Sequence, residues 1–189
     1  MTRPLRTPAM SNQRGSSLVE FAVLLPLLLI LVFGAIDLGR AIQFNNILVN
    51  MSREGANLAA RTQISPQAII DALNHTAAPI AMETDGMIYL TRITGTKLNP
   101  ACTTNCVVEA RVRAQYRATV GGAISSRIYT CPGWSGATCS VPNPLPEIEW
   151  DMALKDAEEV WVAEVACNYA PVTGFALIGK RQLYSRTVL

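Results

Sequence analysis

The longest apolar stretch of the chain, residues 18–36, limits what the chain can fold into. Its nineteen residues include a single charged side chain, that of Glu20. An α-helix of this length is roughly 28 Å long, close to the thickness of the hydrocarbon core of a bilayer. The apolar part of an ordinary secretory signal is shorter, at about 7–15 residues. The stretch therefore predicts a helix that crosses a membrane once, in contact with membrane lipid.

The charges around this stretch predict its orientation. Arg3, Arg6 and Arg14 precede it without any acidic residue, and one arginine, Arg40, follows it. Basic flanking residues are retained in the cytoplasm. We therefore expect a cytoplasmic N-terminus and the bulk of the chain on the outer side of the membrane.

Glu20 is costly inside a membrane span. A carboxylate costs about 2.5 kcal/mol or more at the bilayer centre, and less near the edge. Two interpretations follow from the residue alone: the side chain reaches the headgroup region, or it pairs with a cationic partner.

The residues before Glu20 suggest which partner that is. Gly15 is followed by four residues and then by Glu20-Phe21, which resembles the class III leader of type IV pilins. The resemblance implies that residues 1–15 are a leader, removed after Gly15 by a prepilin peptidase, with Ser16 as the first mature residue. In that family the new amino group pairs with the glutamate at the fifth mature position, here Glu20, often across subunits.

An ordered set of motifs continues through residues 12–62, about a third of the chain. The motifs are RGSSLVEF at 14–21, Pro26 in a leucine run, GAIDLGR at 34–40 and REGA at 53–56. This set resembles the TadE-like family, the minor pilins or pseudopilins of the tight adherence (Flp) pilus.

The family resemblance implies a location and a set of partners. The expected location is the bacterial inner membrane, with the bulk of the chain in the periplasm, or a place in the pilus or at its tip. The implied partners are other pilins or pseudopilins of the same system, the prepilin peptidase and the inner-membrane assembly machinery. The implied role is in assembly of the pilus.

The helical pattern continues beyond the membrane span. Apolar side chains recur at helical spacing through residues 41–62, with polar side chains largely between them. We expect one helix over about residues 17–62, with a transmembrane half at 16–40 and an amphipathic half at 41–62. Pro26 removes a backbone donor and should bend this helix.

Gly34 and Gly39, with Ala35, form a patch of small residues within this helix. Such a patch lets another helix approach closely. The alternative, that glycine is simply tolerated in a membrane helix, stays open.

Residues 63–189 predict an extracytoplasmic α+β domain. Ser65-Pro66 begins a short helix that ends before Pro79. Segments with strand character follow at 86–94, 107–118, 158–169 and 182–189. The expected fold class is α+β, with the long N-terminal helix packed on an antiparallel β-sheet, as the resemblance to pilins also implies.

Residues 107–118 alternate between apolar and polar side chains, which predicts one packed and one solvated sheet face. The apolar set is Val108, Ala110, Val112, Ala114 and Tyr116, and the polar set is Glu109, Arg111, Arg113, Gln115 and Arg117. Within 158–169, Glu158 and Glu164 are expected on a polar face. If the two segments are neighbouring strands, these carboxylates meet the arginines.

All five cysteines follow the predicted span, in a compartment where disulfides form. An odd number leaves at least one thiol outside intrachain pairs. Short loops favour Cys102–Cys106 and Cys131–Cys139, although the sequence alone does not choose among the pairings. Cys167 lies among apolar residues, so we expect it to be a buried free thiol.

Residues 119–157 are rich in glycine and proline and predict a long loop. Loops of this length are usually functional or disordered, and the two cysteines within it indicate that it is held in place for display. The alternative to a pilus protein is therefore a signal-anchored extracytoplasmic module. It would bind a surface, a polysaccharide or an envelope protein through this loop.

The sequence has no constellation for catalysis. Its one histidine cannot supply the usual metal pair or a histidine-paired nucleophile, and the cysteine spacings are not those of zinc sites. The net charge of +2 comes without a clustered basic patch, which argues against nucleic-acid binding. We expect no enzyme activity, no cofactor and no metal.

Overall fold

The computed structural model describes residues 16–171 and 181–189. The predicted leader, including Gly15 and the three arginines before it, lies outside the described residues. The helices are α1 (Ser16–Arg61), α2 (Pro66–Thr76) and α3 (Met82–Asp85). The strands are β1 (Gly86–Lys97), β2 (Val108–Arg117), β3 (Trp134–Ser135), β4 (Thr138–Cys139), β5 (Glu159–Tyr169) and β6 (Arg181–Val188).

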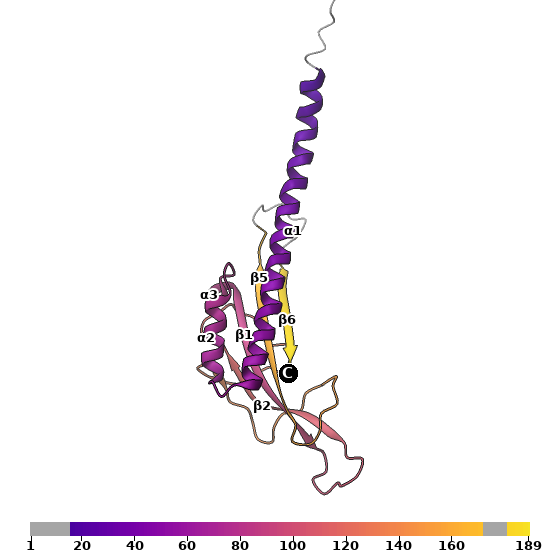
Figure 1. Cartoon of the computed structure of the whole chain (residues 1–189), viewed down its shortest axis with the longest axis vertical. Helices are drawn as coiled ribbons and strands as arrows, with labels where there is room; N and C mark the ends of the chain where they lie inside the picture. The colour runs from indigo at the N-terminus through magenta and orange to yellow at the C-terminus, as the bar shows by residue number, and fades with distance from the viewer. Residues whose placement is uncertain (1–15, 172–180) are drawn as a thin grey trace, which may run out of the picture.

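α1 is a single helix of 46 residues that continues through Pro26. Its first half extends away from the domain, and its second half lies on the sheet (Figure 1). Leu48 and Ala56 are fully buried there, and Met51 is 3% exposed. One helix can protrude at one end and pack on the sheet at the other, because apolar residues surround its first half but occupy only one face of its second half. The prediction of a long helix packed on an antiparallel sheet is confirmed.

α2 begins where the sequence predicts. The Oγ of Ser65 accepts a hydrogen bond from the backbone N–H of Ala68 at 3.3 Å. Pro66 is the first helical residue, a position where the missing N–H has no partner to lose. The buried face of α2 includes Ile70 and Leu73, which join the core formed by α1 and the sheet.

The sheet has six antiparallel strands in the order β3-β4-β2-β1-β5-β6. β1 is central, with β2 on one side and β5 on the other. The condition under which Glu158 and Glu164 would meet the arginines of 107–118 directly, that the two segments are neighbouring strands, is therefore not met. Arg113 of β2 instead pairs with Glu159 of β5 at 3.2 Å. β1 and β2 are consecutive antiparallel strands joined by residues 98–107, which leaves the other edge of β1 for β5.

A β-bulge in β2 changes which of its side chains share a face. The register against β1 shifts between Val112 and Ala114, which leaves Arg113 as an extra residue. Val112 and Ala114 therefore face opposite sides of the sheet. The prediction of a single apolar face over 107–118 is wrong beyond the bulge.

Both faces of the sheet are covered. α1 and α2 pack on one face, where Gly55 of α1 approaches Leu90 and Ala163 of the sheet. Residues 118–157 fold back over the other face, where Ile128, Ile148, Trp150 and Leu154 pack against Ile93, Ala110 and Val162. The predicted solvated face is therefore wrong: Gln115 is 0% and Glu164 is 1% exposed.

Candidate assembly surface

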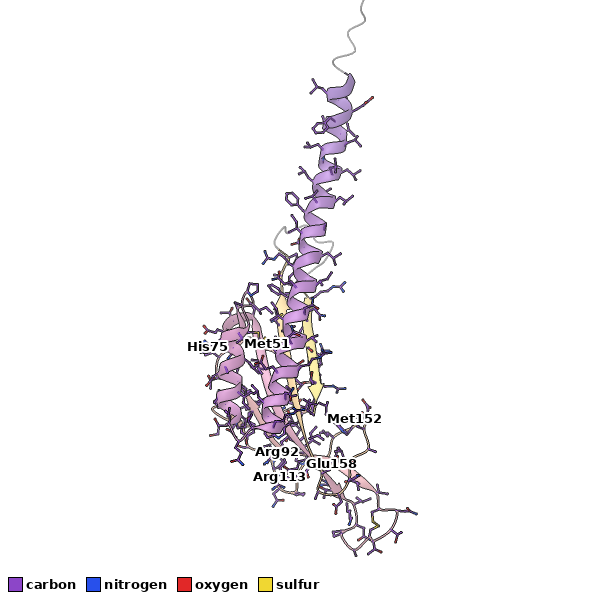
Figure 2. All side chains as sticks on the ribbon, viewed as in Figure 1. Met51, His75, Arg92, Arg113, Met152 and Glu158 are labelled. Atoms are coloured by element: carbon purple, nitrogen blue, oxygen red, sulfur yellow. A yellow bond between two sulfur atoms is a disulfide. The ribbon has the colours of Figure 1, made fainter. Side chains whose placement is uncertain are left out.

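The protruding half of α1 exposes a continuous apolar surface. Leu18 and Val23 are each 71% exposed, and Phe33 is still 38% exposed. Figure 2 shows side chains projecting on all sides of this part of the helix. An exposed apolar area of this extent marks a membrane or protein interface. The helix is long and apolar enough to cross a membrane, so it fits a single-pass anchor.

Glu20 lies on this surface, exposed to the outside of the helix. It borders a shallow groove together with Val19, Val23 and Leu24. None of the ion pairs found among residues 16–171 and 181–189 includes Glu20. Ser16 begins α1, four residues before Glu20. Pairing of Glu20 with a Ser16 amino group stays a prediction.

The glycines of α1 have two different environments. Among residues 16–171 and 181–189, no atom lies within 4 Å of a methyl group added to Gly34 or Gly39, so this part of the chain leaves both positions open. A methyl group added to Gly55, in the docked half, would lie 2.9 Å from Cδ1 of Leu73 and 3.4 Å from Cβ of Ala163. Gly55 thus allows α1 to pack closely on the domain. The predicted role of the two open glycines in helix packing is not tested.

Tyr169 fixes the point at which α1 leaves the domain. Its hydroxyl donates a hydrogen bond to the carbonyl oxygen of Asp37 at 2.8 Å. Its ring meets the ring of Phe44 edge-on, with centroids 5.4 Å apart. Burial raises the pKa of the Tyr169 phenol, which keeps the hydroxyl protonated as a donor. The sequence did not predict this contact.

Residues 15–57 match the family model of TadE-like proteins. This TadE-like segment begins at Gly15, includes Glu20 and both open glycines, and ends just after Gly55 in the docked half of α1. The match confirms the expected resemblance over this range. It indicates a protein associated with the tight adherence pilus. The comparisons with curated proteins and with solved structures gave no match.

All five cysteines lie outside the TadE-like segment. Cys102 and Cys106 form a disulfide with Cα atoms 5.6 Å apart, and Cys131 and Cys139 form another with Cα atoms 5.8 Å apart. These are the two pairs that the sequence favours. Cys167 is a free thiol, 1% exposed, and burial raises its pKa to about 11. It is therefore a poor nucleophile at neutral pH.

Glu164 of β5 anchors residues 118–157 to the sheet. Its carboxylate accepts hydrogen bonds from the Oγ of Ser126, from the backbone N–H of Arg127 at 2.9 Å and from the hydroxyl of Tyr184 at 2.8 Å. Burial and the neighbouring carboxylate raise the pKa of Tyr184, so its hydroxyl remains a donor. These hydrogen bonds connect β5, residues 118–157 and β6.

Gln115 of β2 holds the same loop from a second strand. Its amide donates to the Oγ of Ser126 at 3.1 Å and to the carbonyl oxygen of Tyr129 at 3.1 Å. The sequence places both Gln115 and Glu164 on a polar face but does not reveal that the loop covers them. The disulfide within 119–157 closes the loop on itself, and these buried polar residues attach it to the sheet.

Proposed function

We propose that this chain is a minor pilin or pseudopilin that takes part in assembly of a tight adherence pilus. It would be processed after Gly15 by a prepilin peptidase and held in the bacterial inner membrane with its N-terminus in the cytoplasm. The observation that carries the proposal is the exposed apolar half of α1, which contains Glu20 and lies within the TadE-like segment. No catalytic step is part of the proposed role.

The proposed mechanism is lateral packing of α1 against helices of other pilins. Lipid tails are as apolar as leucine, so association within the bilayer depends on close packing and on polar contacts. Gly34 and Gly39 leave room for close packing. A lone carboxylate costs about 2.5–3.5 kcal/mol at the centre of a membrane span and less near the edge, where Glu20 lies. Pairing of Glu20 with the Ser16 amino group of a neighbouring subunit would remove part of this cost and favour assembly over isolated residence in lipid.

The proposal predicts that Glu20→Ala abolishes pilus assembly without removing the protein from the membrane. The matched control is Glu54→Ala, because Glu54 is an exposed glutamate of the same helix, in its docked half. Both variants are expressed in the native host in place of the original chain. Membrane fractions are blotted, and sheared pili are counted by electron microscopy. Normal pili from Glu20→Ala would refute the charge-pairing mechanism.

The proposed processing has a separate test. The intact mass of the chain purified from native membranes is expected to lack residues 1–15. Reduction should then add four hydrogens, two for each disulfide. A chain that keeps its leader would contradict prepilin processing. It would favour the alternative of a signal-anchored binding module that acts through residues 119–157.

A further inference from the structure

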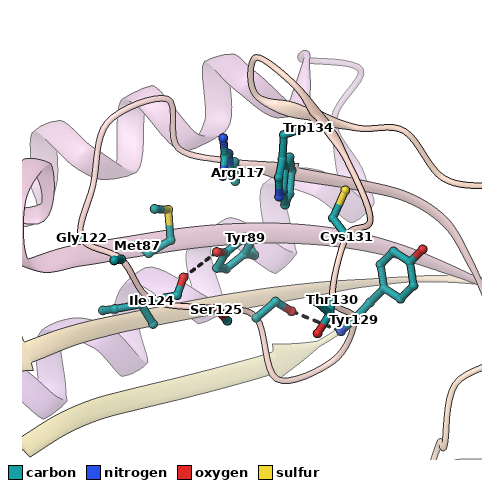
Figure 3. A pocket seen from close by; sticks show the side chains of 12 residues that line it. Met87, Tyr89, Arg117, Gly122, Ile124, Ser125, Tyr129, Thr130, Cys131 and Trp134 are labelled. Atoms are coloured by element: carbon teal, nitrogen blue, oxygen red, sulfur yellow. Dashed lines mark hydrogen bonds between the residues drawn. The ribbon is translucent and has the colours of Figure 1, made fainter.

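The loop 118–134 and the sheet enclose a pocket of about 310 Å³ on the side of the sheet opposite α1. Figure 3 shows Arg117 and Trp134 along one side, Tyr89 at the centre, and Ser125 and Tyr129 toward the opposite side. This volume is near the lower end of the roughly 300–1,000 Å³ that small-molecule sites occupy. The pocket therefore has room for a small molecule or for a single monomer of a polymeric ligand.

The walls of this pocket are held in place before any ligand binds. Ser125 belongs to the part of the loop that is attached to the sheet by the hydrogen bonds of its neighbour Ser126 with Glu164 and Gln115. The side with Trp134 belongs to β3, which pairs with β4 at Cys139 and is closed by the disulfide from Cys131. The hydroxyl of Tyr89 is fixed by a hydrogen bond to the carbonyl oxygen of Ile124 at 2.6 Å. A site with fixed walls loses little conformational entropy when it binds.

Arg117 differs from the other arginines of β1 and β2. Arg92 and Arg113 both pair with Glu159, and Arg111 pairs with Glu109. None of the ion pairs within the described part of the chain includes Arg117. Its guanidinium carbon instead lies 4.4 Å over the ring of Trp134.

Stacking on Trp134 uses one face of the Arg117 guanidinium and leaves its in-plane N–H donors available. These donors match the two oxygens of a carboxylate. Ser125 and Thr130 are exposed at the same pocket and offer hydroxyl groups. The half-buried ring of Trp134 adds aromatic surface beside the cation. Tyr89 is 6% exposed and lines the same pocket, with its ring centroid 6.0 Å from that of Trp134.

We propose that this pocket binds a carboxylated sugar unit, such as a uronic acid of an extracellular polysaccharide. Arg117 binds the carboxylate, the loop hydroxyls bind ring hydroxyls, and the aromatic rings contact the apolar face of the sugar. Hydroxyl groups and aromatic surface around one cation favour a sugar over a simple carboxylate. The pocket lies outside the TadE-like segment and away from the protruding half of α1, so binding does not depend on the proposed assembly role.

The test uses the full chain purified in detergent micelles, with ligand-observed saturation-transfer NMR. The probes are D-glucuronate, D-glucose, which lacks the carboxylate, and propanoate, which lacks the sugar ring. We expect glucuronate to bind at least about tenfold more tightly than either of the other two, since a charge-assisted bidentate contact and ring contacts each contribute about one decade. Equal binding of glucose would overturn the role of the carboxylate, and equal binding of propanoate would overturn the sugar.

Variants separate the pocket from the rest of the surface. Arg117→Gln should weaken glucuronate binding roughly tenfold. Arg113→Gln is the matched control, because Arg113 lies on the same strand but pairs with Glu159, and it should leave binding unchanged. Ser125→Phe changes an exposed side chain and fills the pocket without altering the core, so it should abolish binding in a folded chain. Unchanged binding in Arg117→Gln or Ser125→Phe, or no binding of glucuronate to the original chain, would overturn the proposal.

Discussion

Replacement of Glu164 by alanine should destabilise the domain more than any change at an exposed acidic residue. The Glu164 side chain is 1% exposed and accepts three hydrogen bonds, from Ser126, Arg127 and Tyr184. Alanine would remove the only acceptor that these three contacts share. Ser126 and Tyr184 could then turn toward other partners, but the backbone N–H of Arg127 is fixed by the chain.

The size of the effect follows from the number of donors. A buried donor left without an acceptor costs about 1–3 kcal/mol. We take the lower limit for each donor, because rearranged side chains or water molecules that enter the site would replace part of the lost hydrogen bonds. Three donors then give a loss of about 3 kcal/mol. For a chain of this size each kcal/mol lowers the melting temperature by about 2–4 °C. We therefore expect a decrease of roughly 6–12 °C.

The assay is thermal unfolding of the full chain in detergent, followed by near-ultraviolet circular dichroism. That signal reports packing of the aromatic rings in the domain and is little affected by the helicity of α1. The matched control is Glu149→Ala, an exposed glutamate of the same loop, which should change stability by less than about 0.5 kcal/mol. A melting temperature for Glu164→Ala within about 2 °C of the original chain would refute the view that this carboxylate anchors the loop.

Three further changes test other parts of the structure. Gly55→Val should destabilise the domain by about 1–3 kcal/mol in denaturant titration, because even a methyl group there lies 2.9 Å from Leu73; unchanged stability would contradict the close packing. The Cys167 thiol, with its pKa raised by burial from 9.0 to about 11, should resist maleimide at pH 8 and react once unfolded. Between pH 9.0 and about 11 the folded state keeps the thiol proton, whereas the unfolded state loses it, so the free energy of unfolding should fall as pH rises through this range. A constant free energy of unfolding over this range would contradict the raised pKa. Cys131→Ser with Cys139→Ser should lower the free energy of unfolding by about 2.5 kcal/mol by the loop-entropy relation, and no loss would show that the loop is held by other contacts.

The long helix could be predicted from sequence because one local signal dominates it. The apolar length of residues 18–36 and the helical spacing through 41–62 agree with α1, Ser16–Arg61. Ser65 and Pro66 likewise predict the start of α2, since capping depends on residues within a single turn. The two disulfides were also predictable, because each joins cysteines that are close together in the sequence.

The sheet was less predictable because its pattern depends on residues far apart. The alternation of 107–118 continues through Arg113, and only the register against β1 reveals the bulge there. Burial of Glu164 depends on a loop more than thirty residues earlier, whose own composition indicates only that it is a loop. The pocket at Arg117 was missed for the same reason: its walls come from β1, β2 and the loop, which the sequence does not place together.

The sheet contacts of α1 set an order for biosynthesis. The docked half of α1 packs mainly on β5 and β6 and much less on β1, and β5 begins roughly 100 residues after α1 ends. At about 5–20 residues per second, the ribosome needs on the order of 5–20 s to produce that length. During this interval Leu48, Met51 and Ala56 lack the two strands that cover most of the docked half of α1. With α1 as the proposed membrane anchor, the amphipathic half would lie at the membrane surface until β5 and β6 arrive, and a chaperone or the bilayer interface itself would cover it for that time.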